Sequence, residues 1–157
     1  MRVLVTVGTH QRGFDALLNS LEPWASKGRD SFVVQAGAST TVLPGARQQA
    51  WFTREEFAKE LALADLVVAH LGCGIAREVQ VAGKPCLFVP RRQERGEHID
   101  DHQEELREAL GGRTGLGFAS PDDDLEAMAG CLVGTRPLPP PWQSDLVRAV
   151  RSWLTQS

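Results

Sequence analysis

The chain has 157 residues, of which 42% are hydrophobic and 24% charged, with a formal net charge of −3. This length suits one domain with a substantial core. The acidic balance argues against a nucleic-acid-binding surface, which is usually basic. No run approaches the roughly 18–20 apolar residues of a membrane span, and the N-terminus lacks the apolar region of a signal peptide. Three cysteines without metal-like spacing fit a reducing cytosol.

In chain order, short apolar runs alternate with amphipathic segments. The apolar runs have the composition of buried parallel strands, most clearly the first, which is β-branched and nearly all apolar. They lie at residues 2–7, 31–37, 49–52, 65–70, 86–90 and 115–119. Helical spacing of apolar residues or helix start signals mark the segments at 14–21, 53–61, 75–82, 101–110 and 121–132. The alternation predicts an α/β fold, in which a parallel sheet is covered by helices on both faces.

Local signals predict several helix ends. Thr53 and Glu56 have the spacing of a capping box, so a helix is expected to start there. Gly83, followed by Pro85, is typical of the residue just past a helix end. Pro23 is expected to end or kink the first helix, since proline cannot donate its backbone hydrogen bond.

Ligands of parallel α/β sheets bind outside the carboxyl ends of the strands. That rule selects the loops that follow the first, second, fourth and fifth strands. These loops span Gly8–Gly13, Gly37–Ser39, His70–Gly74 and Arg91–Asp101. They hold most of the glycine, histidine and acidic residues that carry chemistry.

The stretch "HLGCGIARE" lies between the fourth strand and the next helix. A helix N-terminus has unpaired amides and a positive dipole end, so Gly72 and Gly74 predict a phosphate cradle. His70 can donate to a phosphate oxygen, and Glu78 can accept from ribose hydroxyls. The alternative is a plain turn from strand to helix, because short glycine motifs are common.

The loop after the first strand offers a second glycine, Gly8, at the carboxyl edge of the sheet. Thr9 and His10 follow it, and both side chains can donate a hydrogen bond to an anion. An ordinary turn with a threonine at the helix entry explains the same residues equally well.

Residues 96–103, "GEHIDDHQ", form the densest polar stretch. His98 and His102 are four residues apart and, with Glu97 or Asp101, would supply metal ligands. Asp101 and Gln103 would alternatively recognise sugar hydroxyls. A third interpretation is a solvated helix start with acidic residues at its positive end.

The C-terminal part divides from the rest at a proline-rich run. We expect a domain at 1–134 and, at 135–157, a linker followed by an amphipathic helix over 142–154. Its apolar positions are Trp142, Leu146, Val147, Val150, Trp153 and Leu154. Such a helix either packs on its own domain or docks on a partner, since tryptophan is enriched in interfaces.

Four motifs together resemble the C-terminal domain of glycosyltransferase family 28. They are "VTVGTH", "VVQAGAS", "ADLVVAHLGCGIAREVQVAGKPCLFVPR" and "GEHIDDHQEEL". The chain is most similar to the small PssE-like subunits of bacterial exopolysaccharide glycosyltransferases. It is also similar to the catalytic subunit of the eukaryotic two-component enzyme that adds the second GlcNAc to dolichol-diphosphate-GlcNAc. The resemblance covers about residues 2–133 and implies a Rossmann-like domain equivalent to the C-terminal half of a GT-B enzyme.

The resemblance also implies a role for each matching residue. His70 and the glycine-rich amides would meet the diphosphate of a UDP-sugar, Glu78 the ribose, Phe52 the uracil, and Asp101 with Gln103 the donor sugar. The implied nucleotide-sugar-binding set is Gly8, Thr9, Phe52, Gly72, Gly74, Ile75, Glu78, Asp101 and Gln103. His10 and His70 are the expected catalytic residues. No metal or other cofactor is implied.

Two positions depart from the family pattern. Leu71 stands where the family usually has Gly or Ala, and Ile75 where it has Thr or Ser. A hydroxyl bonded to a charged phosphate is worth roughly 1.5–3 kcal/mol. Only the backbone amide of Ile75 can replace it, so weaker donor binding or a partner's help is expected.

These observations predict the donor-binding catalytic subunit of a two-component glycosyltransferase. It would move a sugar from a UDP-sugar to a lipid-linked or polysaccharide acceptor. A membrane-anchored partner, docked through the 142–154 helix, would hold the acceptor and keep this chain at the inner face of the membrane. One alternative is a non-catalytic partner that stabilises or regulates another transferase. The other is a metal-dependent hydrolase that uses His98, Asp101 and His102.

Overall fold

The computed structural model describes residues 1–92 and 102–138, which form an α/β fold with a six-stranded sheet. The strands are β1 (Arg2–Thr6), β2 (Ser31–Gln35), β3 (Arg47–Gln49), β4 (Leu66–His70), β5 (Cys86–Val89) and β6 (Leu116–Phe118). The helices are α1 (Asp15–Ala25), α2 (Arg54–Leu63), α3 (Cys73–Ala82), α4 (His102–Leu110) and α5 (Leu125–Gly130).

All strand pairings are parallel, and the strand order is β3-β2-β1-β4-β5-β6. The chain builds outward from β1 to β3, then returns to the middle and builds outward in the other direction from β4 to β6. Strands β1 and β4 are therefore the point where the order reverses. Loops leave these two strands toward opposite faces, so a crevice opens at their carboxyl ends.

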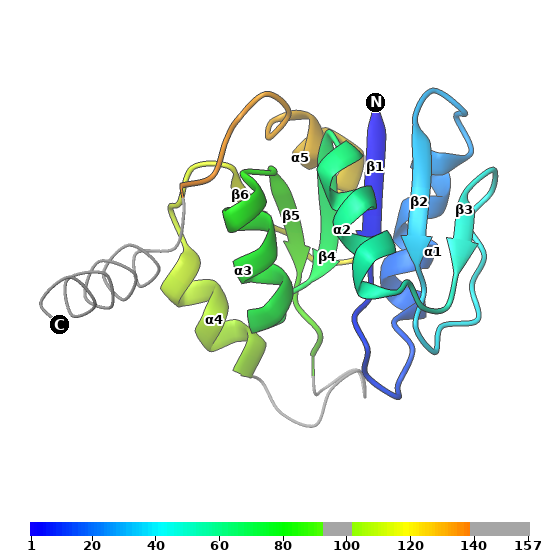
Figure 1. Ribbon diagram of the computed structural model, residues 1–157, viewed down its shortest axis with the longest axis horizontal. Helices are drawn as coiled ribbons and strands as arrows, with labels where there is room; N and C mark the ends of the chain where they lie inside the picture. Colours follow the sequence, from blue (N-terminus) through cyan, green and yellow to red (C-terminus); the bar gives the residue numbers. More distant parts are fainter. Residues whose placement is uncertain (93–101, 139–157) are drawn as a thin grey trace, which may run out of the picture.

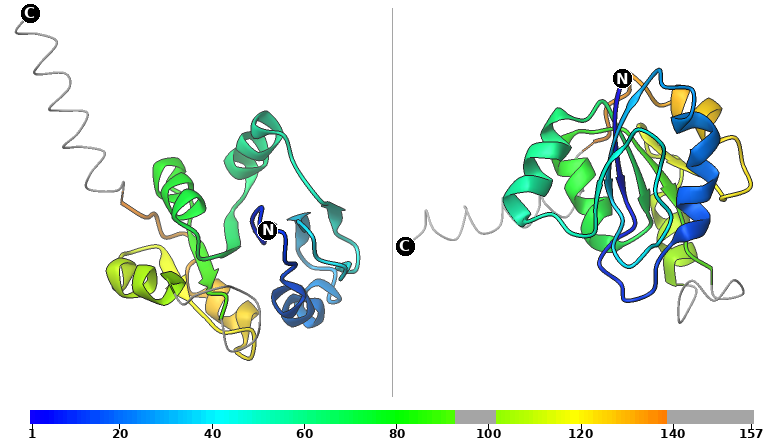
Figure 2. Two further views of the ribbon diagram at one scale, coloured as in Figure 1. Left: turned by 90° about the horizontal axis from the view of Figure 1, so that it is seen from below. Right: turned by 90° about the vertical axis from the view of Figure 1, so that its right-hand side faces the viewer.

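The sheet is the middle of three layers, with α2, α3 and α4 on one face and α1 and α5 on the other (Figures 1 and 2). Each face has its own buried cluster. Leu17, Leu18, Leu125 and Ala129 pack with Val3, Val5 and Val68 on the α1–α5 face. Leu61, Ile75, Val79 and Leu110 pack with Leu4, Val67 and Phe88 on the other face. Because helices cover both faces of the sheet, the side chains on both sides of the central strands are buried, which explains the apolar interiors of β1, β2, β4 and β5.

Two of the local signals at helix ends, those at Thr53 and Gly83, are confirmed. The Thr53 side chain accepts a hydrogen bond from the backbone of Glu56, and the Glu56 side chain accepts one from the backbone of Thr53. Gly83 ends α3 in the left-handed conformation, with φ of +63°. Both features depend on contacts within a few residues, which is why the sequence predicts them.

Three boundaries differ from the sequence-based expectation. Pro23 lies inside α1, which continues for two more residues and ends at Ala25. The helix tolerates proline so close to its end because it loses only one backbone hydrogen bond there. Strand β3 pairs at Arg47–Gln49 rather than at 49–52, because its partners are Val33–Gln35. Helix α3 begins at Cys73, two residues before the expected start, so Gly74 belongs to its first turn.

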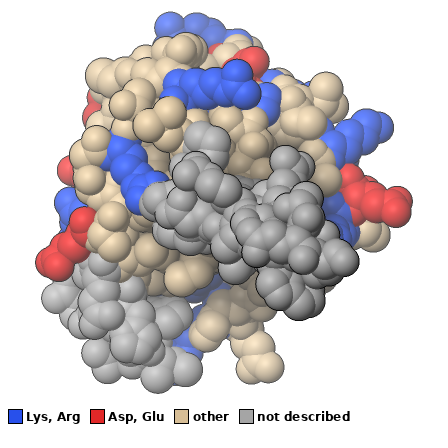
Figure 3. All heavy atoms as spheres, turned by 60° about the vertical axis from the view of Figure 1, so that its left-hand side comes forward, with Lys and Arg blue, Asp and Glu red and all other residues tan. Residues whose placement is uncertain are grey.

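Within the described residues, no helix has both the length and the apolar composition needed to cross a membrane. On the face drawn in Figure 3, the Lys and Arg side chains of the described residues are interspersed with acidic and neutral ones. The expected helix at 142–154 and the loop residues His98 and Asp101 lie outside the described part of the chain.

Candidate functional site

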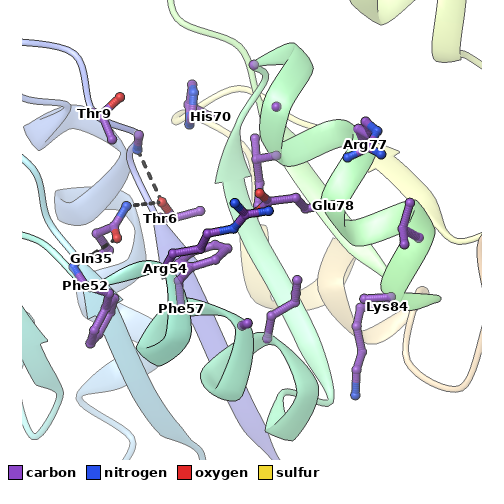
Figure 4. Close-up of a pocket in the computed structure, with 18 of the residues that line it drawn as sticks. Thr6, Thr9, Gln35, Phe52, Arg54, Phe57, His70, Arg77, Glu78 and Lys84 are labelled. Atoms are coloured by element: carbon purple, nitrogen blue, oxygen red, sulfur yellow. Dashed lines mark hydrogen bonds between the residues drawn. The ribbon is translucent and has the colours of Figure 1, made fainter.

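A pocket of about 970 Å³ opens at the carboxyl ends of β1 and β4 and continues between α2 and α3 (Figure 4). It brings together residues from the carboxyl ends of β1, β2 and β4, from neighbouring loops and from both helices. Its lining comprises Thr6, Gly8, Thr9, Gln35, Phe52, Thr53, Arg54, Phe57, Ala58, Leu61, Ala62, His70, Gly72, Gly74, Ile75, Arg77, Glu78, Val81, Ala82 and Lys84. Eight of the residues selected from the sequence are in this set: Gly8, Thr9, Phe52, His70, Gly72, Gly74, Ile75 and Glu78.

His70 stands at the end of β4 with its imidazole ring between two glycines. A Cβ placed on Gly8 would come within 2.5 Å of the ring's Cε1, and one placed on Gly72 within 2.6 Å of Nε2. Gly8 also has φ of +84°, a conformation that other residues rarely adopt. The two glycines are therefore required by the close approach of the ring, which is held at the mouth of the pocket.

The N-terminus of α3 also faces this pocket. Gly72 caps it without a side-chain hydrogen bond, and no acidic residue occupies its first turn. The amide of Ala76 donates to the carbonyl of Gly72, so the first intrahelical bond begins there. The amides of Cys73, Gly74 and Ile75 precede it and have no intrahelical acceptor. Together with the helix dipole, they form a site that favours an anion.

A chain of buried polar side chains fixes the opposite wall. The amide of Gln35 donates to Thr6 Oγ1 over 3.2 Å, and the backbone N–H of Phe52 donates to Gln35 Oε1 over 3.2 Å. The guanidinium of Arg47 lies 5.5 Å from the centre of the Phe52 ring. Thr6 and Gln35 are buried strand residues that an apolar pattern would not select. Their polar groups position the Phe52 segment at the pocket.

Leu71 and Ile75, the two departures from the family pattern, belong to the core on the α2–α3 face. Leu71 is fully buried and Ile75 is 8% exposed, in one cluster with Val79 and Phe88. Ile75 also reaches the pocket wall. The two side chains therefore pack α3 against the sheet, and an apolar group replaces a hydroxyl at the cradle.

Several charged residues of the lining were not selected from the sequence. Arg54 extends from the first turn of α2 toward Glu78 on α3, so their side chains face each other across the pocket (Figure 4). Arg77 and Lys84 also line it. Lys84 donates to the carbonyls of Ala62 and Ala64 and closes the far end. Only the packing of α2 beside α3 reveals these residues, because nothing in their local sequence distinguishes them from solvated positions.

Two predicted residues do not line the pocket. Nδ1 of His10 accepts a hydrogen bond from the backbone N–H of Arg12 over 3.1 Å, so this atom is engaged within the loop. Gln103, at the start of α4, is buried and its Oε1 accepts from the backbone N–H of Arg91 over 2.8 Å. Their roles stay predictions. Asp101 lies outside the described residues.

Across residues 1–92 and 102–138, no three His, Cys, Asp or Glu side chains are arranged to hold a metal ion. The metal hypothesis required His98 and Asp101, which lie outside that part of the chain. The described chemistry is that of an anion site: helix amides, an imidazole and glycine backbone.

The strand order and the position of the pocket define a Rossmann-like domain with a cavity at the point where the strand order reverses. The comparison with known families specifies its kind. Residues 2–117 match the glycosyltransferase family 28 C-terminal domain, and the chain belongs to this family.

Similar proteins include a UDP-N-acetylglucosamine--N-acetylmuramyl-(pentapeptide) pyrophosphoryl-undecaprenol N-acetylglucosamine transferase of Geobacter metallireducens. It is 40% identical over 62 residues, which are 40% of this chain and 16% of that protein. Among solved structures, Acinetobacter baumannii MurG has a TM-score of 0.62 at 22% identity, covering 83% of this chain and 41% of its own. The glycosyltransferase SnogD of Streptomyces nogalater has a TM-score of 0.62 at 20% identity, covering 85% and 35%. The chain thus spans less than half the length of each relative.

Proposed function

We propose that the chain is the donor-binding catalytic subunit of a two-component glycosyltransferase, and that its donor is a UDP-sugar. The observation that carries the proposal is the anion cradle. His70, held between Gly8 and Gly72, and the open amides of α3 face one pocket together with Glu78. The family match and the donor in the name of the Geobacter relative support the same donor class.

The diphosphate would lie against the first turn of α3. There the amides of Cys73, Gly74 and Ile75 donate to its oxygens, and His70 adds a side-chain donor. Gly8 and Thr9 would approach the diphosphate from the β1 side. The absent hydroxyl at Ile75 leaves the backbone amide as that position's only donor.

The nucleoside would lie along the groove between α2 and α3. Phe52, fixed by Gln35, frames the base, and the carboxylate of Glu78 accepts from the ribose hydroxyls. The donor sugar would then extend toward the start of α4, where Gln103 and Asp101 are expected to contact it.

Transfer requires the acceptor hydroxyl to attack the anomeric carbon of the sugar. A new glycosidic C–O bond forms, the C–O bond to the diphosphate breaks, and UDP leaves with the bond's electron pair. Configuration at the anomeric carbon is inverted by this direct displacement. Negative charge develops on the departing diphosphate, where the α3 dipole and amides stabilise it most. The acceptor's proton goes to a general base, for which His10 is the candidate on this chain.

The acceptor would be bound by a second polypeptide. The family model that the chain matches describes a C-terminal domain, and we assign donor binding to that domain. The Geobacter relative's name specifies a pyrophosphoryl-undecaprenol acceptor. We therefore propose a membrane-anchored partner that docks through residues 142–154 and holds a lipid-linked or polysaccharide acceptor at the cytoplasmic face.

UDP titration by calorimetry tests the donor site. Replacing Glu78 with Gln keeps the shape but removes the charged acceptor, which is worth roughly 1.5–3 kcal/mol in a hydrogen bond. UDP affinity should fall about 10- to 150-fold. The matched control is Glu22→Gln, an exposed change on α1 that should leave the affinity unchanged. Equal affinity of wild type and Glu78→Gln would refute the site.

One observation favours a second function, that of a non-catalytic partner of another transferase. Ile75 places a buried apolar group where the family pattern has a hydroxyl. Co-expression with the membrane-anchored subunit separates the two functions. Full transferase activity with Glu78→Gln in this chain would favour the non-catalytic role, whereas a large loss supports donor binding here.

A further inference from the structure

Arg91 follows β5 and is a buried charged residue that the sequence gives no reason to place inside. Arg91 is only 1% exposed to solvent, although it begins a charged stretch that the sequence would predict to be a solvent-exposed loop. Burying a guanidinium is costly unless its donors are paired. The groups that pair with the Arg91 guanidinium therefore indicate its structural role.

The guanidinium reaches across the sheet edge to the loop between β1 and α1. Nη1 donates to the carbonyls of Arg12 over 3.2 Å and of Gly13 over 2.9 Å, and Nη2 donates to the carbonyl of Val7 over 2.8 Å. The same group lies 4.7 Å from the centre of the Phe14 ring. One side chain thus holds both ends of the loop that contains Gly8, Thr9 and His10.

The backbone of this loop is tightly constrained at Gly8, so its conformation depends on contacts that hold it in place. Gly8 has φ of +84° and lies directly against the His70 ring. Arg91 is itself tied to α4, because its backbone N–H donates to Gln103 Oε1 over 2.8 Å. Three parts of the carboxyl edge, namely the β1–α1 loop, the end of β5 and the start of α4, are therefore joined through one residue.

We propose that Arg91 is a positioning residue for donor binding, which sets the Gly8–Thr9 backbone and the adjacent His70 ring for the diphosphate. This inference rests on the proposed function. Arg91 acts through the loop and is not among the residues that line the pocket. Its planar fork of donors suits several carbonyls at once together with an aromatic face. The compact ammonium of lysine cannot reproduce that arrangement.

The test compares UDP with uridine, since only UDP carries the diphosphate. In Arg91→Lys, UDP affinity should fall at least tenfold, whereas uridine affinity, measured by NMR titration, should stay within twofold. Amide hydrogen exchange of residues 8–13 in the ligand-free protein should speed up. Arg91→Met should show a larger loss of the same kind. A general loss of stability would not produce this selectivity.

The control is Leu125→Ala, a core truncation in α5 that lowers stability at a residue that belongs neither to the loop nor to the pocket lining. It should leave both affinities within twofold. The positioning role is overturned if Arg91→Lys weakens UDP and uridine binding equally, or if it leaves UDP affinity unchanged. In either case the donor site itself stands as long as the wild-type chain binds UDP. A wild-type chain that does not bind UDP overturns the proposed function, and this inference with it.

Discussion

Replacing Gly72 with Ala perturbs the imidazole at the cradle through a single methyl group. The backbone of Gly72 has φ of −105°, which alanine adopts without strain, so the effect is steric. The added Cβ would lie 2.6 Å from Nε2 of His70, and contact this close forces one group to move. The movement of the ring is restricted, because Gly8 also lies against it.

The expected magnitude has two parts. Overpacking at such a site typically costs about 1–3 kcal/mol of stability. In the proposed site, a displaced His70 would lose its charge-assisted bond to the phosphate, which is worth roughly 1.5–3 kcal/mol. The loss of that bond corresponds to UDP binding that is about 10- to 150-fold weaker.

Calorimetric titration with UDP and a thermal melt measure both parts. The matched control is Gly130→Ala in α5, where an added Cβ meets no atom within 4 Å. That control should leave UDP affinity unchanged. If Gly72→Ala bound UDP as tightly as wild type, then either His70 does not contact the diphosphate or the ring is not confined by the two glycines, and the reasoning above is refuted.

Two further predictions concern stability. Burial raises the pKa of Glu60, but the ion pairs with Arg2 and Arg47 outweigh it, so the folded pKa is lower than the ordinary value of 4.5. This stabilisation is complete above that value and is lost as the pH falls through the folded pKa. Urea unfolding of Glu60→Gln should show lower stability at pH 7 and a weaker decline below pH 4.5 than wild type; equal slopes would contradict the assignment. Thr53→Ala should cost about 1 kcal/mol by removing the cap of α2, whereas Thr53→Ser should retain it in the same unfolding assay.

Local patterns in the sequence were sufficient for the elements and for part of the site. The alternation of apolar runs and helical segments predicts a parallel α/β sheet, because strands buried on both faces must be apolar throughout. The capping box at Thr53 and the left-handed Gly83 depend on neighbours within a few residues. The rule that ligands bind at the carboxyl ends of strands selected the loop that contains His70 and Gly72, and both residues line the pocket.

Only the tertiary structure decided how these parts meet. The order β3-β2-β1-β4-β5-β6 places Gly8 beside His70, although 62 positions separate them in the chain, and this contact explains why position 8 is a glycine. The burial of Arg91 also follows from long-range packing, since its acceptors lie on a loop at the other end of the sequence. Sequence periodicity reports which side of an element is apolar. It carries no information on which distant backbone carbonyls will surround a charged side chain, and so the support of the site became visible only in the folded chain.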